Sequence, residues 1–87
     1  MNSTWIVNYE GNEVRVENSW IKGEKLFVNN KLQDEKVGIK SSSFLSGHLI
    51  SKDGSKKPIK AYIDSGLMSM KCRIFIDDEK VEVTQIR

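Results

Sequence analysis

A thiol, an imidazole and a set of carboxylates are the side chains of this sequence that could carry out catalysis. Cys72 and His48 are the only cysteine and the only histidine among the 87 residues. Nucleophilic catalysis needs a nucleophile within reach of a base that a third group orients. Cys72 alternates with Ile74 and Ile76, so in a strand its side chain faces the core, where burial raises the pKa of a thiol. We therefore expect an inert cysteine, a histidine at the surface or at an edge, and no catalytic residue.

The acidic residues do not follow the spacing of a metal-binding motif. One cysteine and one histidine are too few for a zinc site built from those ligands. Asp77, Asp78 and Glu79 are adjacent, but neighbouring side chains of a strand point to opposite faces. The glycine and the distal glutamate of a calcium loop are also absent, so these acids are more typical of a hairpin turn. The six glycines are dispersed and form no phosphate-binding loop. We expect no metal and no cofactor.

Lysines gather in the second half of the chain, although the overall charge is only +2. Proteins that bind single-stranded nucleic acid combine such cations with aromatic side chains on which bases stack. If Ile59, Ala61 and Ile63 face inward, Lys60 and Tyr62 share the outer face of one strand. The candidate contacts are Lys52, Lys56, Lys57, Lys60 and Tyr62. A hydrated hairpin tip explains the same lysines, and we favour it over a nucleic-acid partner.

Two segments could present apolar side chains to a protein partner or to a second copy of the chain. Leu67, Met68 and Met70 lie close together, and methionine is suited to adaptable contacts. Trp20 lies in a connection between strands, where an exposed tryptophan would anchor a partner. The alternative is that the methionine segment fills the core and that Trp20 covers an open end of the fold. For both segments we favour this alternative over a partner contact.

The elements that would position these residues are β-strands. Apolar residues alternate with polar ones almost throughout, and no stripe with helical spacing extends over three turns. Asn29-Asn30 and Asp77-Asp78 are pairs that tolerate left-handed backbone geometry, so each predicts a tight hairpin. Residues 64–66 are expected to interrupt a strand. The expected strands span 4–9, 13–17, 24–28, 31–36, 44–50 and 59–63, followed by a hairpin over 72–83.

The two halves of the chain share a layout. Two pairs of glycines are separated by the same 43 positions, namely Gly11 with Gly54 and Gly23 with Gly66. This spacing indicates two similar four-strand units, about 4–37 and 43–85. The second unit has five additional residues, which are most simply placed at 67–71.

These units predict an all-β fold with a single domain over residues 1–87. Two groups of four strands favour a small antiparallel β-sandwich of about eight strands, and a closed β-barrel is the alternative. The faces of strand 44–50 are undecided, because apolar residues occupy both of them. The side chains expected to face inward are Trp5, Val7, Tyr9, Val14, Val16, Leu26, Val28, Ile59, Ala61, Ile63, Cys72, Ile74, Ile76, Val81 and Val83.

The cysteine content and the hydropathy also bear on the compartment. Cys72 has no partner for an internal disulfide, which favours a reducing environment. Residues 1–7 contain no basic residue and too short an apolar run for a secretory signal. No stretch approaches the roughly 18 apolar residues that a membrane-spanning helix requires. We therefore expect a cytoplasmic protein that has no membrane partner.

Residues 61–67 and 73–78, together with Lys80, follow a pattern of strand, Ser-Gly pair, second strand, Asn/Asp turn and lysine. This part of the second half, about a quarter of the chain, resembles the β-sandwich domain of the Fas apoptotic inhibitory molecule family. Asp78 stands where the family pattern has a glycine. The resemblance implies a compact, non-catalytic β-sandwich with interaction roles, and it assigns no functional residue.

The lack of a coherent catalytic set favours a non-enzymatic domain that acts through its surface, as a protein-interaction or small-ligand module. Weak binding of single-stranded nucleic acid through the lysine-rich hairpin and Tyr62 is the second hypothesis. The third is an enzyme with a pocket between the sheets, which requires His48 to lie within hydrogen-bond reach of Cys72 or of a carboxylate.

Overall fold

The computed structural model describes residues 2–19, 21–37, 42–65 and 70–87, and in these residues it contains only β-strands and their connections. No helix in this part of the chain is long and apolar enough to cross a membrane. The all-β prediction is confirmed. The strands of the described residues are β1 (Asn2–Tyr9), β2 (Asn12–Ser19), β3 (Gly23–Val28), β4 (Lys31–Lys36), β5 (Ser42–Ile50), β6 (Lys56–Ser65), β7 (Met70–Ile76), β8 (Glu79–Val81) and β9 (Thr84–Gln85).

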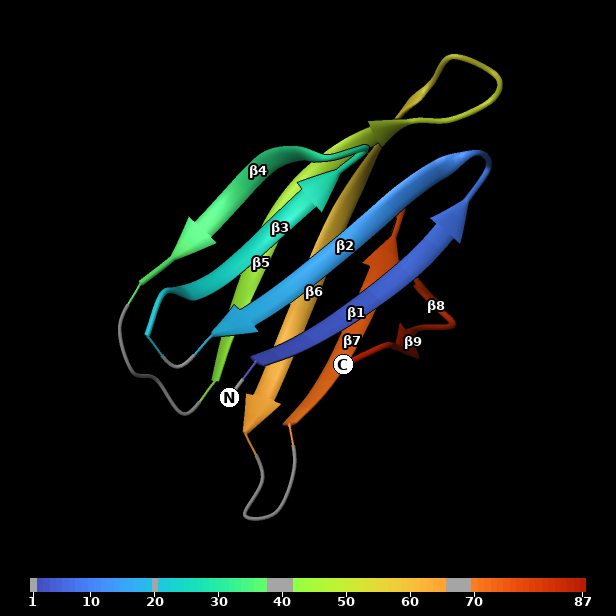
Figure 1. Cartoon of the computed structure of the whole chain (residues 1–87). Helices are drawn as coiled ribbons and strands as arrows, with labels where there is room; N and C mark the ends of the chain where they lie inside the picture. The colour runs from blue at the N-terminus through green and yellow to red at the C-terminus, as the bar shows by residue number, and fades with distance from the viewer. Residues whose placement is uncertain (1, 20, 38–41, 66–69) are drawn as a thin grey trace.

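The strands form two antiparallel sheets that pack face to face (Figure 1). The first sheet has the order β4-β3-β2-β1-β9, and the second has the order β5-β6-β7-β8. The two sheets stay separate, so the chain forms the expected sandwich and not the closed barrel. Each half of the chain makes a meander of four strands, and β9 returns to pair with Trp5 and Ile6 of β1. An internal repeat between the halves stays a prediction.

Two-residue turns with left-handed backbone geometry set the registers of three hairpins. Asn29 and Asn30 have φ values of 51° and 67°, and Asp77 and Asp78 have φ values of 55° and 65°. Positive φ at both central residues is the type I′ arrangement, whose twist matches that of the flanking strands. The turn between β1 and β2 has the same signs. Both hairpin turns predicted from the sequence are confirmed.

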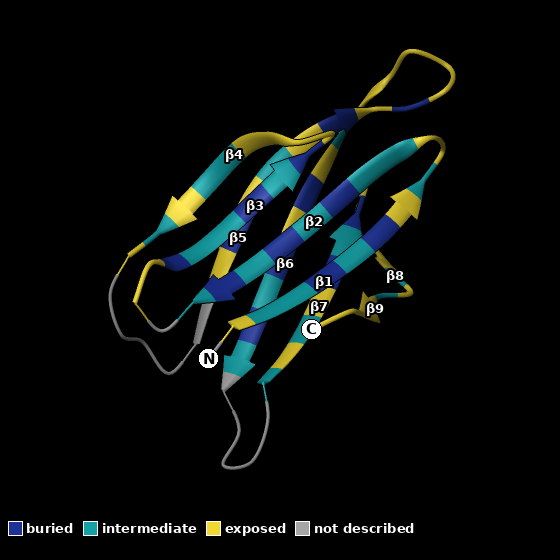
Figure 2. Cartoon of the chain, viewed as in Figure 1, coloured by how far each residue is buried: buried dark blue, intermediate teal, exposed yellow. Residues whose placement is uncertain are grey.

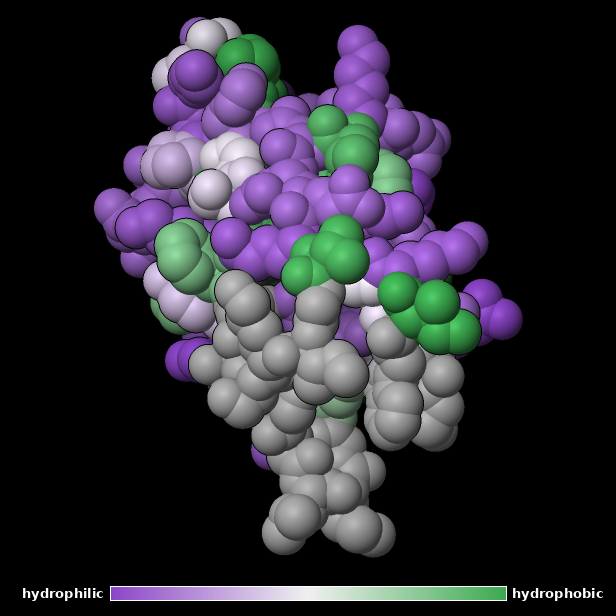
Figure 3. Space-filling view, turned by 90° about the vertical axis from the view of Figure 1, so that its left-hand side faces the viewer, coloured by the Kyte–Doolittle hydropathy of each residue, from purple (hydrophilic) through white to green (hydrophobic). Residues whose placement is uncertain are grey.

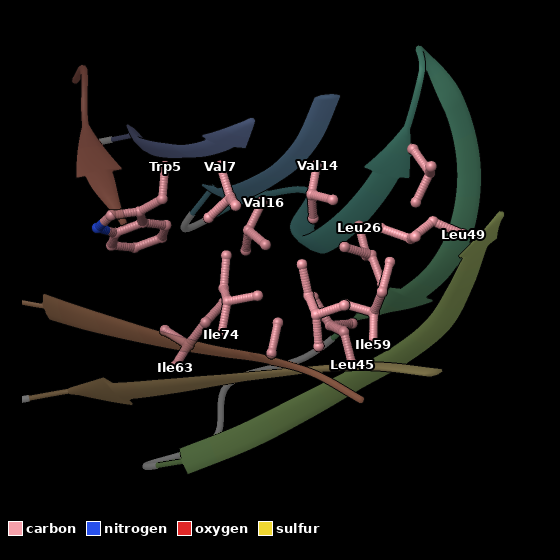
Figure 4. Packing of buried hydrophobic residues seen from close by; sticks show 13 residues of the cluster. Trp5, Val7, Val14, Val16, Leu26, Leu45, Leu49, Ile59, Ile63 and Ile74 are labelled. Atoms are coloured by element: carbon pink, nitrogen blue, oxygen red, sulfur yellow. The ribbon is translucent and has the colours of Figure 1, made fainter. Parts of the chain in front are cut away.

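The core lies between the sheets and follows the alternation of the strands, which appears as buried bands in Figure 2. Buried side chains from the two sheets point toward one another (Figure 4). Leu45 and Leu49 of β5 join this core, which decides the strand whose faces the sequence leaves open. Eleven of the residues expected to face inward are buried. The other four are half-buried against the cluster, and they are Tyr9, Cys72, Val81 and Val83.

The edges of β4 and β5 meet along one side of the sandwich, where side chains of β4 accept hydrogen bonds from the backbone of β5. The backbone N–H of Ser46 donates to Oδ2 of Asp34 at 2.8 Å. The backbone N–H of His48 donates to Oε1 of Gln33 at 2.9 Å. These bonds satisfy an edge that could otherwise pair with another chain. Figure 3 shows this side of the molecule, where hydrophilic residues separate the hydrophobic ones.

Gly47 permits the close approach of β5 to the first sheet. A Cβ atom at this position would lie 2.6 Å from Oε1 of Gln33 and 3.1 Å from Cδ2 of Leu26. The pairing of β3 with β4 shifts its register between Leu26 and Phe27, which is a β-bulge. Because a bulge bends its strand, it helps to turn this corner of the first sheet toward β5.

Several strands extend beyond their expected bounds, and two of these differences bear on the predictions for residues 64–71. β6 continues past Asp64 to its end at Ser65, because Asp64 pairs with Lys71 of β7 in the ladder between the strands. The expected break at 64–66 is therefore wrong for its first two residues, and residue 66 lies outside the described part of the chain. Since β7 begins at residue 70, strand pairing also takes up the last two of the additional residues at 67–71.

We predict that Gly47→Ala destabilises the fold, because the added Cβ must displace the Gln33 side chain from the His48 N–H. Overpacking of this kind costs about 1–3 kcal/mol. A urea titration would show the loss as a lower free energy of unfolding. Ser46→Ala is the matched control, since Ser46 is exposed on the same strand and keeps its backbone N–H. Equal stabilities of the two variants would contradict the close approach.

Candidate functional site

The catalytic candidates Cys72 and His48 do not converge. Cys72 is half-buried on the inner side of β7, whereas His48 is exposed on the outer side of β5, and β6 lies between these strands. The His48 imidazole makes no hydrogen bond to a residue that the structure describes. The expected edge position of His48 is confirmed. The two side chains cannot act together as nucleophile and base in this arrangement.

The environment of Cys72 suppresses thiolate formation. Burial raises the pKa of the thiol to about 12, and the negative charges of Asp64 and Glu24 add to the effect. The thiol is therefore neutral at physiological pH, and a neutral thiol is a poor nucleophile and a poor metal ligand. These properties agree with the inert cysteine expected from the alternation of β7.

The carboxylates mainly shape turns. No three histidine, cysteine or acidic residues of the described ranges lie close enough together to hold a metal ion. Asp77 and Asp78 form the turn between β7 and β8. Asp53 accepts hydrogen bonds from Ser51 and Ser55, and these bonds hold the pKa of its carboxyl well below the usual range.

The outer face of the second sheet carries a row of aromatic side chains. Phe44 of β5, Tyr62 of β6 and Phe75 of β7 have the parity that points away from the core. The Phe44 and Tyr62 rings are stacked, with centroids 5.5 Å apart and planes at 24°. The Phe75 ring lies 5.7 Å from Tyr62 and is perpendicular to it. Phe44 remains 46% exposed, so the row is accessible from solvent.

Cations surround this row. Nζ of Lys36 lies 5.8 Å from the centre of the Phe44 ring, and the guanidinium carbon of Arg73 lies 5.4 Å from the centre of the Tyr62 ring. Lys60 and Lys80 flank Phe75 on the neighbouring strands. We call the whole group the aromatic face, and it consists of Lys36, Phe44, Lys60, Tyr62, Arg73, Phe75 and Lys80.

Cations outnumber carboxylates at the outward strand positions of this sheet. Among the described outward positions of β5 to β8, the one carboxylate is Asp64, which pairs with Arg73 at 3.1 Å. The cations at such positions are Lys56, Lys60, Lys71, Arg73 and Lys80. The face is therefore much more positive than the overall charge of +2 suggests.

The outer face of the first sheet has balanced charges. Arg15 pairs with two flanking glutamates and lies 4.5 Å from the centre of the Phe27 ring. Lys25 pairs with Glu35 at 3.7 Å. Both outer faces thus contain cation–aromatic contacts, but the aromatic face alone of the two combines such contacts with excess positive charge.

Part of the predicted nucleic-acid surface lies on the aromatic face. Lys60 and Tyr62 share the outer side of β6, as expected from the alternation of that strand. Lys56 is exposed on the same side, nearer to the turn between β5 and β6. These three side chains therefore point in a common direction.

The other two predicted lysines lie elsewhere. The Lys57 ammonium donates to the Tyr9 hydroxyl at 3.1 Å and lies 3.9 Å from a carboxylate oxygen of Glu10. The bond to Tyr9 raises the pKa of Lys57. It also holds the Lys57 side chain on the inner side of β6. Lys52 is exposed in the turn, and its backbone N–H donates to Glu10 at 2.8 Å. The lysine-rich hairpin is thus not one continuous surface.

Sequence reasoning missed five members of the aromatic face, namely Lys36, Phe44, Arg73, Phe75 and Lys80. The two-residue turn after Ile76 already implies that Phe75 and Lys80 are neighbours, because it fixes the register of β7 with β8. Phe44 could not be placed in the same way. Its position beside Tyr62 depends on the register of β5 with β6, across a longer turn.

Most of the predicted partner contacts fall outside the described residues. This applies to Trp20, Leu67 and Met68. Met70 is half-buried at the start of β7 and packs against the core. Its sulfur accepts a hydrogen bond from the Asn18 side chain at 3.3 Å. Met70 therefore contributes to the interior in this structure.

Comparisons with protein-family models, with curated proteins and with solved structures found no match. The resemblance of the second half to the Fas apoptotic inhibitory molecule domain stays a prediction. Function must therefore be argued from the aromatic face itself.

We predict that Cys72 reacts slowly with a disulfide reagent such as DTNB in the folded protein. At pH 8 a thiol with a pKa of about 12 has a thiolate fraction on the order of 10³ lower than an unperturbed cysteine. The reaction should therefore accelerate strongly in 6 M urea, which the absorbance of the released thiolate would report. Similar rates in the two conditions would contradict the buried environment.

The raised pKa also predicts how stability depends on pH. The unfolded thiol ionises near pH 8.5, whereas the folded thiol stays protonated, so the free energy of unfolding should fall as the pH rises above about 8.5. Cys72→Ala is the matched control, and it should lack this component of the pH dependence. Parallel curves for the two proteins between pH 8 and 10 would show that the thiol is not perturbed.

Proposed function

We propose that this chain is a non-enzymatic binding domain whose aromatic face binds single-stranded nucleic acid. The contrast between the two outer faces carries the proposal. One face has balanced charges, whereas the other joins three aromatic rings to unbalanced cations. This combination offers stacking surfaces to bases and positive charge to phosphates. The proposed contacts lie on the sheet face and not at the tip of the lysine-rich hairpin.

The contact between Lys36 and Phe44 provides an entry point for a base. A cation over an exposed ring contributes about 0.5–1 kcal/mol. A base stacked on an aromatic side chain contributes about 1–3 kcal/mol. A base can therefore replace the Lys36 ammonium over the Phe44 ring, and the displaced ammonium remains close enough to contact the attached phosphate. Tyr62, which stacks on Phe44, is in turn contacted by the Arg73 guanidinium.

Lys60 and Lys80 would contact the phosphate backbone. They lie on either side of Phe75 in adjacent strands, and neither forms an ion pair with a described residue. Because exposed lysines bind phosphates as mobile point charges, they favour backbone contacts without fixing a sequence.

The composition of the face supports binding with little sequence preference. Asparagine and glutamine are the side chains that commonly read adenine edges, and strands β5 to β8 contain neither. Arg73 could read guanine, but it is already paired with Asp64. Stacking and backbone charge therefore dominate the proposed interaction. An acidic protein surface is the competing ligand, and the test below separates the two.

We predict that the double variant Lys60→Glu/Lys80→Glu loses most of its affinity for fluorescein-labelled 12-nucleotide oligo(U), measured by fluorescence anisotropy between 20 and 200 mM NaCl. Loss of two phosphate contacts should reduce the slope of log K against log salt by about 1.4. Lys25→Glu/Lys31→Glu is the matched control, because it makes the same total charge change on strands of the first sheet. Binding that is independent of salt, or equal in the two variants, would exclude the proposed surface.

We also predict that Phe44→Leu weakens oligo(U) binding about 5- to 150-fold, because it removes a stacking interaction of about 1–3 kcal/mol while keeping an apolar side chain. Phe27→Leu is the control on the other outer face. Polyglutamate of similar length serves as the competing probe. If it binds as tightly as oligo(U) and Phe44→Leu leaves both affinities unchanged, the face recognises acidic polymers in general and the nucleic-acid proposal fails.

A further inference from the structure

The edge of β7 is only partly covered by β8. The pairing with β8 extends over three residues, from Ile76 opposite Glu79 to Ile74 opposite Val81. β7 itself begins four residues earlier, and its other side pairs with β6 along its whole length. Residues 70–73 therefore have no strand on one side within the described part of the chain. We call these four residues the open edge.

Backbone groups of alternate residues of the open edge point away from β6. The two-residue turn makes Ile76 and Glu79 a hydrogen-bonded pair, and Asp77 donates its N–H in the opposite direction, to the carbonyl of Pro58, at 2.9 Å. Hydrogen-bonding directions alternate along a regular strand, and the pairing of β6 with β7 has no register shift. The N–H and C=O groups of Cys72 therefore face the open edge.

A groove runs beside the open edge. It has a volume of about 510 Å³ and lies between β7 and the strands β1 and β9 of the other sheet. Met70, Cys72, Val81 and Val83 line it, and all four pack against the core while remaining only half-buried. An inward side chain of an added strand would bury the exposed parts of these four side chains.

The edge on the opposite side of the sandwich is treated differently. The edge of β5 is satisfied at Ser46 and His48 by the side chains of Asp34 and Gln33. No described side chain makes such a bond to the backbone of Cys72. Within the described residues, the open edge thus combines available backbone groups with an adjacent apolar groove, which is the arrangement used in recognition by strand addition.

We infer that the open edge binds an extended segment of a partner protein, in which an apolar residue lies between two acidic residues. The partner residue opposite Cys72 would exchange hydrogen bonds with it and turn its side chain into the groove. The residues on either side would then face outward, opposite Lys71 and Arg73. Opposite charges across neighbouring strands stabilise such pairs.

The same charges argue against a second copy of this chain. In an antiparallel pair of two open edges, Cys72 can face either Cys72 or residue 70 of the other copy. The first register places Lys71 against Arg73, and the second places Lys71 against Lys71. Because like charges directly opposite are destabilising, both registers are disfavoured. Lys71 and Arg73 therefore favour an acidic segment, one carboxylate of which would compete with Asp64 for Arg73.

The test uses blocked heptapeptides of alternating glutamate and valine, with amide exchange and chemical shifts of the whole ¹⁵N-labelled protein as readouts. We expect saturating peptide to slow hydrogen exchange of the Cys72 amide at least tenfold. The same peptide N-methylated at its valines should not bind, because the methyl groups block the bonds to Cys72. Equal binding of the N-methylated peptide, or no binding at millimolar concentration, would refute strand addition.

Charge selectivity is tested with a lysine-valine peptide. Lys71→Glu should weaken binding of the glutamate peptide and strengthen binding of the lysine peptide. The control Lys52→Glu, in the turn between β5 and β6, should change neither affinity. Phe44→Leu should also leave peptide binding intact, which distinguishes the open edge from the aromatic face. Equal affinities of the two peptides for the unmodified protein would overturn the acidic preference. A dimer in which the Cys72 amide is already protected would show that a second copy occupies the edge.

Discussion

Strand register is the constraint on which the rest of this structure depends. A shift of one residue along a strand exchanges its two faces, so the core and the outer surface are assigned together. The turn at Asp77 and Asp78 illustrates this, because positive φ at both residues fixes the pairing of β7 with β8. Once Ile74 faces the core, Phe75 must face solvent beside Lys80. The interior and the aromatic face are thus two consequences of one register.

The two outer faces use similar contacts for different purposes. Arg15 and Arg73 each lie over an aromatic ring, but Arg15 sits between two glutamates, whereas the carboxylate beside Arg73 is Asp64. Exposed ion pairs contribute little to stability, so this difference hardly affects the fold. It does affect the field around the molecule, because unbalanced cations on one face attract anionic ligands over a distance. The asymmetry therefore concerns binding more than folding.

Local patterns predicted most of the fold, and the limits of that prediction are physical. Alternation within hairpins was sufficient for the inward side chains of β1, β2 and β3, and residue type was sufficient for the asparagine and aspartate turns. β5 was undecided because both of its faces carry apolar residues. Packing against Leu26 beside Gly47, which no local pattern contains, selects Leu45 and Leu49 for the core. Only Lys60 and Tyr62 of the seven members of the aromatic face were predicted, for the same reason, since its rings come from three strands.

The two sides of the sandwich differ in how they treat their strand edges. Where β4 meets β5, long strands are brought together by a bulge and a glycine, and the side chains of Gln33 and Asp34 replace a missing strand. On the opposite side lie two short strands, β8 with three residues and β9 with two, which pair with only part of β7 and β1. A sheet edge that is neither paired nor capped can accept another strand. The open edge beside Cys72 therefore follows from the shortness of β8.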